Sequence, residues 1–182
     1  MAATAWWWPP AELIGINADC GGSSHPVSIG GAACDRPLRS ATMKILLAVD
    51  GSEIGLAAVR HLVELSKSLA ETPTVTLLYV DPPLLRSVAL ELGSDGVERY
   101  HAENGAYALK KARTALKRAQ IPFVEKVLVG EPAESIIKQA KSGKADLVVM
   151  GTHGRGALKQ LFVGSVALKV IATSPVPVVV AR

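Results

Sequence analysis

Glycines and a serine recur at fixed spacing in the C-terminal part of this 182-residue chain. Gly151 and Gly154 are followed, after nine intervening residues, by Gly164 and Ser165, in the pattern G-x2-G-x9-G-[ST]. Glycine lets backbone amides approach an anion with no Cβ in the way, and successive N–H groups in such a turn form a concavity for phosphate oxygens. We expect Gly164 and Ser165 to open a helix, whose N-terminus favours the same anion. The pattern therefore predicts a polyphosphate site.

A structural interpretation of the same glycines stays open, because a tight turn from strand to helix also uses glycine. The Ser or Thr in the pattern and its position directly after a buried run favour the phosphate interpretation. The loop is not a Walker A motif, since the chain contains no GxxxxGK[ST]. It is not a Rossmann fingerprint either, since no third glycine follows Gly154 and Gly156 at the required spacing. His153 and Arg155 either contact phosphate or face solvent.

Two further strand ends carry groups that suit a nucleoside. Asp50 ends the first apolar run, beside the point where strand order is expected to reverse. Its carboxylate either hydrogen-bonds ribose hydroxyls or an adenine amine, or caps the helix that follows. Val80 lies at the end of the second run, and its backbone either pairs with an adenine edge or simply ends the strand. The residues alone leave both choices open.

Alternating strands and helices position these groups. Runs rich in Val, Ile and Leu predict strands, and amphipathic stretches predict helices, the first with Ser52 as N-cap. The expected strands are 45–49, 75–80, 123–129, 147–150 and 176–180, and the expected helices are 53–70, 97–119, 132–142 and 164–174. Because the strand runs are apolar throughout, we expect an α/β fold, a three-layer sandwich whose parallel strands are covered on both faces. The segment 82–98 is either a lid over the site or an irregular loop.

Residues 1–42 differ from the rest in composition. They are rich in Gly, Pro, Ser and Ala and show no strand or helix periodicity, so we expect a disordered N-terminal extension before a domain at 43–182. Met43 directly precedes the first strand, which favours it as the natural start. The alternative is a functional tail that uses the Trp6–Trp8 triplet as an anchor.

Composition excludes several classes of protein. The net charge of +4 is mild, and the densest basic run lies within an expected helix, which favours a solvated helix face over nucleic-acid binding. No run of 18 or more apolar residues is present, so no membrane span is expected, and with no secretory signal we expect a cytoplasmic protein. Both cysteines, Cys20 and Cys34, precede the domain, which therefore has no disulfide or thiolate metal site.

Four segments together resemble the ATP-binding branch of the universal stress protein family. They are MKILLAVDGS, LLYVD, VLVGEPAESIIKQA and ADLVVMGTHGRGALKQLFVGSVALKVIATSPVPVVVAR, and the resemblance covers 43–182. It implies an adenine nucleotide α-hydrolase-like fold with five parallel strands in the order 3-2-1-4-5. It also implies a homodimer that pairs through the last strand, Val176 to Ala181.

The resemblance also implies roles for individual residues. Asp50 and Val80 would contact the adenosine of ATP, and Mg²⁺ would bridge the phosphates. The phosphates would be held by Gly151, Gly154, Gly164 and Ser165, with a backbone amide from Val166. The implied function is an ATP-binding stress-response or signalling module. The alternative is a slow ATPase or phosphotransfer enzyme, which needs a positioned base and strong positive charge at the γ-phosphate. No Asp or Glu is positioned by the sequence next to the γ-phosphate. This favours a protein that binds ATP and has no catalytic residue.

Overall fold

The computed structural model describes residues 42–152 and 163–182. Within them, strands and helices alternate along the chain. The strands are β1 (Lys44–Ala48), β2 (Thr74–Asp81), β3 (Phe123–Val129), β4 (Leu147–Gly151) and β5 (Val178–Ala181), and the helices are α1 (Glu53–Ser68), α2 (Arg86–Arg118), α3 (Pro132–Ser142) and α4 (Ser165–Thr173). All four strand pairings are parallel, in the order β3-β2-β1-β4-β5, which confirms the expected topology.

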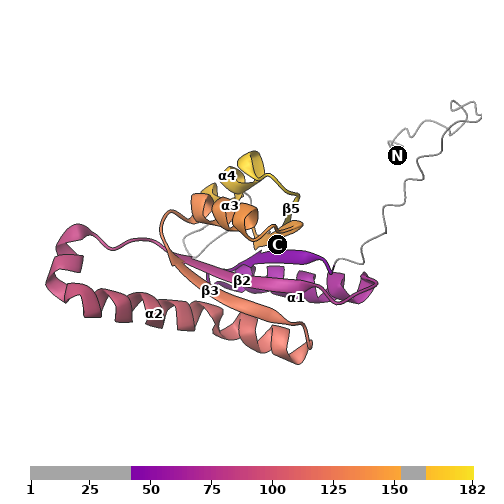
Figure 1. Cartoon of the computed structure of the whole chain (residues 1–182), viewed down its shortest axis with the longest axis horizontal. Helices are drawn as coiled ribbons and strands as arrows, with labels where there is room; N and C mark the ends of the chain where they lie inside the picture. The colour runs from indigo at the N-terminus through magenta and orange to yellow at the C-terminus, as the bar shows by residue number, and fades with distance from the viewer. Residues whose placement is uncertain (1–41, 153–162) are drawn as a thin grey trace, which may run out of the picture. The chain divides into compact units, whose positions relative to one another are not determined.

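Helices cover both faces of this sheet, as Figure 1 shows. On one face, α1 and α2 pack over a core that includes Leu47, Leu62 and Leu109. On the other, α3 and α4 pack over a second core that includes Leu46 and Val148. Consecutive residues of β1 thus enter opposite cores, because side chains alternate across a strand. The three-layer sandwich is confirmed.

The strand β3 departs from the expectation that every strand is covered on both faces. It lies at one edge of the sheet, and Val124 is 59% exposed and Val129 50% exposed. The expectation was wrong here because edge position, not apolar content, decides coverage. Glu125 accepts two hydrogen bonds from Arg113 of α2 at 2.5 and 2.7 Å, and this charged side chain on an edge strand opposes pairing with other chains.

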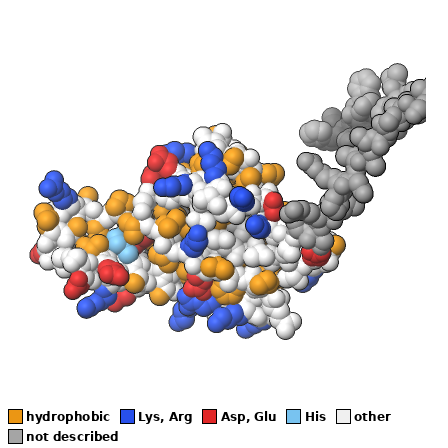
Figure 2. All heavy atoms as spheres, viewed as in Figure 1, with side chains coloured by type: hydrophobic (Ala, Val, Ile, Leu, Met, Phe, Trp, Pro, Cys, Tyr) orange, Lys and Arg blue, Asp and Glu red, His pale blue; other side chains and the backbone are white. Residues whose placement is uncertain are grey.

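The second helix begins eleven residues earlier than expected, at Arg86 rather than at residue 97. Its course is broken at Gly93, where φ is +66° and ψ is 174°, a conformation that glycine adopts readily. The segment 82–98, left open between lid and irregular loop, is therefore largely helical. Its apolar side chains did not reveal a helix because they are not buried on one face. Leu85 and Leu90 are each 74% exposed, and hydrophobic side chains are visible at that end of the molecule in Figure 2.

The last strand begins at Val178 rather than Val176, because Pro177, which has no N–H, precedes it. The expected N-terminal extension covers residues 1–42, of which 1–41 lie outside the described residues. Within the described ranges, no helix combines the length and the apolar character needed to cross a membrane.

Candidate functional site

A cavity of about 740 Å³ opens beyond the carboxyl ends of β1, β2 and β4. Open parallel sheets bind ligands at this place, where strand order reverses from one side of β1 to the other. The cavity has the size of a small-molecule or cofactor site. Of the site residues expected from sequence, those that line it are Asp50, Val80, Gly151, Gly164, Ser165 and Val166. Gly154 lies outside the described residues, as do His153 and Arg155.

Two backbone hydrogen bonds hold the start of α4 and the residue that follows β4. The N–H of Gly164 donates to the carbonyl of Thr152 at 2.7 Å, and the N–H of Thr152 donates to the carbonyl of Ala181 at 2.9 Å. The start of α4 is thus fixed against the ends of β4 and β5. The expectation that the Gly164 N–H faces a phosphate was wrong, because this N–H donates to the carbonyl of Thr152. The donors left at the helix start are the N–H groups of Ser165, Val166 and Ala167, which have no acceptor within an α-helix.

The start of α4 also differs from those of α1 and α3 in its cap. Ser52 caps α1 by accepting from the N–H of Gly55 at 3.0 Å, and Glu131 caps α3 by accepting from the N–H of Glu134 at 2.6 Å. The N-cap of α4 is Gly164, which has no side chain to accept a hydrogen bond. An anion in the cavity would therefore take the place of a capping side chain.

Gly151 brings the end of β4 into close contact with the start of α1. A Cβ at this position would lie 3.0 Å from the carbonyl oxygen of Ile54 and 3.1 Å from its carbonyl carbon. Backbone atoms cannot move aside as a flexible side chain can, so any larger residue would separate β4 from α1. Glycine is required at Gly151 by this packing as well as by access to the cavity, and the two interpretations of the glycine pattern are compatible.

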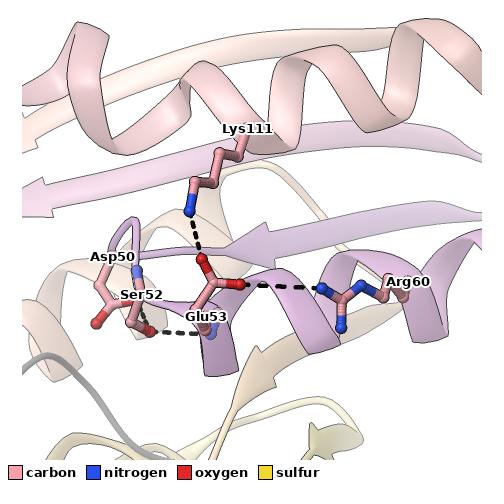
Figure 3. Close-up of polar contacts among 6 residues, drawn as sticks. Asp50, Ser52, Glu53, Arg60 and Lys111 are labelled. Atoms are coloured by element: carbon pink, nitrogen blue, oxygen red, sulfur yellow. Dashed lines mark hydrogen bonds and ion pairs between the residues drawn. The ribbon is translucent and has the colours of Figure 1, made fainter.

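Asp50 also lines the cavity and is held by the first turn of α1. Its Oδ1 accepts from the N–H of Ser52 at 3.0 Å and from the Ser52 hydroxyl at 2.6 Å. Asp50 thus supports the capping residue and does not itself cap the helix. Figure 3 shows this turn together with Glu53, whose carboxylate contacts Lys111 of α2 and lies 3.9 Å from Arg60. Part of the basic run on α2 is therefore used to join two helices.

A buried polar cluster that was not predicted from the sequence lies on the α2 side of the cavity. It is centred on Asp81, which is 5% exposed and accepts three side-chain hydrogen bonds. The donors are the Tyr79 hydroxyl at 2.8 Å, Nδ1 of His101 at 2.7 Å and Nδ2 of Asn104 at 3.0 Å. Asp81 directly follows Val80, and His101 and Asn104 are three residues apart on one helix face. That spacing is visible in the sequence, but the register of α2 against β2 is not.

Opposing effects act on the pKa of Asp81. Burial raises the pKa, but hydrogen bonds from Asn104, His101 and Tyr79 outweigh it and leave the pKa below the ordinary value of 3.8. The carboxylate is therefore ionised at neutral pH and acts only as an acceptor.

We expect this ionised carboxylate to make stability depend on pH. Because the pKa of Asp81 is lower in the folded state, its contribution is present above about pH 4 and is lost as the pH falls through the folded value. Asp81→Asn should lower the free energy of unfolding by about 2 kcal/mol at pH 7 and reduce the loss of stability on acidification. Urea unfolding at pH 7, 5 and 3 measures both, with the exposed Asp95→Asn as control. If wild type and Asp81→Asn lost the same free energy of unfolding between pH 7 and pH 3, this prediction would be contradicted.

Comparison with known proteins gives consistent similarities over the described part of the chain. A family model described as the universal stress protein family matches residues 42–182. A universal stress protein of Thermus aquaticus is 36% identical over 139 residues, which span 76% of this chain and 97% of that protein. The solved structure of one from Methanocaldococcus jannaschii has a TM-score of 0.66 at 28% identity, over 76% of this chain and 94% of that one. A further structure, a universal stress protein in complex with cAMP, is 24% identical with a TM-score of 0.59, over 79% and 99% of the two chains.

Proposed function

The chain belongs to the universal stress protein family, and from that membership and its cleft we propose that it binds ATP as a nucleotide-dependent stress-response or signalling module. The observation that carries the proposal is the uncapped start of α4. Its N–H groups lie on the same cavity as Asp50 and Val80, and that cavity is large enough for a nucleotide. A universal stress protein solved with cAMP has the same fold, which supports an adenine nucleotide as the ligand class.

Different residues of the cavity suit different parts of the ligand. In the proposed complex, Asp50 and the Val80 backbone contact the ribose and base. The N–H groups of Ser165 and Val166 and the positive end of the α4 dipole bind phosphate oxygens. Gly154 belongs to this proposed phosphate site by its place in the sequence pattern. Mg²⁺ would be coordinated mainly by phosphate oxygens, since the described residues contain no group of three or more His, Cys, Asp or Glu able to hold a metal.

The lining of the cavity favours a binder over an ATPase or phosphotransfer enzyme. Phosphoryl transfer needs positive charge at the transferred group and a group that orients the nucleophile. Among the described residues that line the cavity, none is Lys, Arg or His. The alternative of slow hydrolysis would have to find such groups outside the described residues, for example at His153 and Arg155.

We also propose that the protein acts in the cytoplasm, where ATP is available, as a homodimer paired through β5. The strand β5 forms the second edge of the sheet, and Val178, Val179 and Val180 are all half-buried. An apolar strand edge is prone to open-ended association unless it is covered. Pairing two such edges about a two-fold axis closes them in a dimer.

We expect purified protein to take up Mg-ATP at one site per chain, with hydrolysis slower than dissociation. Calorimetry measures the stoichiometry and affinity. Single-turnover hydrolysis with labelled ATP, set beside the dissociation rate of the same nucleotide, separates a binder from an enzyme. Absence of binding at millimolar Mg-ATP would refute the proposed function, and rapid multiple turnover would establish the enzyme alternative.

A further inference from the structure

The α2 wall of the cavity presents the side-chain amide of Asn104. This residue is half-buried, lines the cavity, and lies on the same wall as Tyr100, Asp81 and Pro82. Its Nδ2 donates to Oδ2 of Asp81 at 3.0 Å. The described part of the chain supplies no hydrogen-bond donor to its Oδ1. One end of the amide is therefore held by the protein, while the oxygen is left for a ligand.

The orientation of this amide follows from the chemistry of Asp81. An ionised carboxylate only accepts hydrogen bonds, so the amide nitrogen, not the amide oxygen, must face it. The amide is therefore fixed by its partner and cannot turn over without losing a hydrogen bond to a buried charge. The carboxylate is itself held by donors from Tyr79 and His101, so the whole cluster defines which atom Asn104 offers to the cavity.

Packing fixes the position of Asn104 as well. His101, one turn earlier on α2, is 8% exposed and bonds to the same Oδ2 of Asp81 at 2.7 Å. Tyr100 packs edge-on against the His101 ring, with 5.4 Å between ring centroids. Gly105 follows Asn104, and a Cβ there would lie 2.6 Å from a methyl group of Val127. The helix is thus held against β2 and β3 on both sides of Asn104.

We propose that Asn104 is a specificity-determining residue that reads the amino group at position 6 of a purine base, and that Asp81 is the positioning residue that fixes its amide. This inference rests on the proposed function and names the part of the nucleotide that the α2 wall selects. Adenine carries a 6-amino donor that Oδ1 of Asn104 can accept, and pairing of Asn with this edge of adenine is a known mode of recognition. A 6-oxo purine places an acceptor against that oxygen and is disfavoured.

The matched pair ATP and ITP tests the proposal, because the two nucleotides have the same ribose and phosphates and differ at position 6 of the base and the adjacent N1 proton. We expect wild type to bind Mg-ATP about tenfold or more tightly than Mg-ITP in calorimetry. Asn104→Leu should bring the two affinities to within about twofold, mainly through weaker ATP binding, and Asn104→Ala serves the same purpose if leucine is not accommodated. The neighbouring exposed Glu103→Gln, which does not line the cavity, should keep the wild-type ratio.

The variant Asp81→Asn tests the positioning role of Asp81, because a purely structural role would not change the ratio of ATP to ITP affinity. With an amide in place of the carboxylate, Asn104 can present either its oxygen or its nitrogen to the cavity. ITP binding should therefore improve relative to ATP, so that the ratio falls while both nucleotides still bind.

Equal affinity of wild type for ATP and ITP, or an unchanged ratio in both Asn104 variants, would overturn this inference and leave the proposed function in place. Absence of binding of either nucleotide by wild type would overturn both together. The two failures are thus distinguishable in the same set of titrations.

Discussion

Replacement of Ser165 by Glu is expected to weaken binding of Mg-ATP by roughly a hundredfold or more in a protein that stays folded. Ser165 is the first residue of α4, is exposed, and lines the cavity. A carboxylate at a helix N-terminus is favourable for the helix itself. The same carboxylate would lie where a phosphate is proposed to bind, and two like charges about 4 Å apart repel by about 4 kcal/mol near a protein surface. That repulsion corresponds to roughly a thousandfold in affinity before screening by salt reduces it.

Two controls distinguish the effect of the added charge from that of the larger side chain, and an effect on phosphate binding from one on base binding. Ser165→Gln has nearly the shape of the glutamate variant without its charge, so it should lose much less affinity. Adenosine has no phosphates, so its affinity should be similar in wild type and Ser165→Glu. Calorimetry with both ligands measures the effects, and thermal unfolding checks that the variants fold. If Ser165→Glu bound ATP as tightly as Ser165→Gln, the phosphates would not lie at the start of α4.

The sequence predicted those parts of the site that depend on a few consecutive residues at the end of a strand. Glycine spacing, the Ser52 cap and the strand-end position of Asp50 depend on a few consecutive residues and on the rule that parallel strands end at one edge. The positions of Asp50, Val80, Gly151 and Ser165 on one cavity follow from that rule.

The parts that the sequence did not predict depend on contacts between distant segments. The Gly164 N–H was expected to face a ligand, yet it bonds to the Thr152 carbonyl across the loop between β4 and α4. Two of the three partners of Asp81, His101 and Asn104, come from α2, 20 and 23 residues further along the chain. Which residues of a long helix meet a given strand end is decided by packing, because helix periodicity defines a face but not a register along the sheet.

The early start of α2 has a similar cause. Leu85, Leu90 and Leu92 are exposed, so the stretch has no single buried face of the kind by which sequence periodicity identifies a helix. The kink at Gly93 also interrupts the pattern. Tyr100 and Asn104, which line the cavity, lie beyond this kink in the part of α2 that the sequence did predict as a helix.

Replacement of Val180 by Pro is expected to convert the proposed homodimer into a monomer without unfolding the domain. The carbonyl of Pro177 accepts from the N–H of Val148 in β4, and the carbonyl of Ala181 accepts from the N–H of Thr152, just after β4. Backbone groups alternate in direction along a strand. The N–H groups of Val178 and Val180 therefore point to the open side of β5, where no strand of the described chain pairs. Proline at position 180 removes one of these donors and leaves the bonds to β4 in place, which is the position in a sheet where proline is tolerated.

The matched control is Val180→Thr, which keeps the N–H and a β-branched side chain. Light scattering coupled to size exclusion should give twice the chain mass for wild type and Val180→Thr, and the single chain mass for Val180→Pro. Thermal unfolding and ATP binding test whether the variant is otherwise intact. If Val180→Pro stays dimeric, the backbone hydrogen bond from the Val180 N–H is excluded as a dimer contact. If wild type is monomeric at tens of micromolar, the homodimer itself is excluded. The outward N–H at position 180 is a backbone group, so every residue except proline keeps it. The effect of Val180→Pro therefore depends on backbone direction and not on the side chain that valine loses.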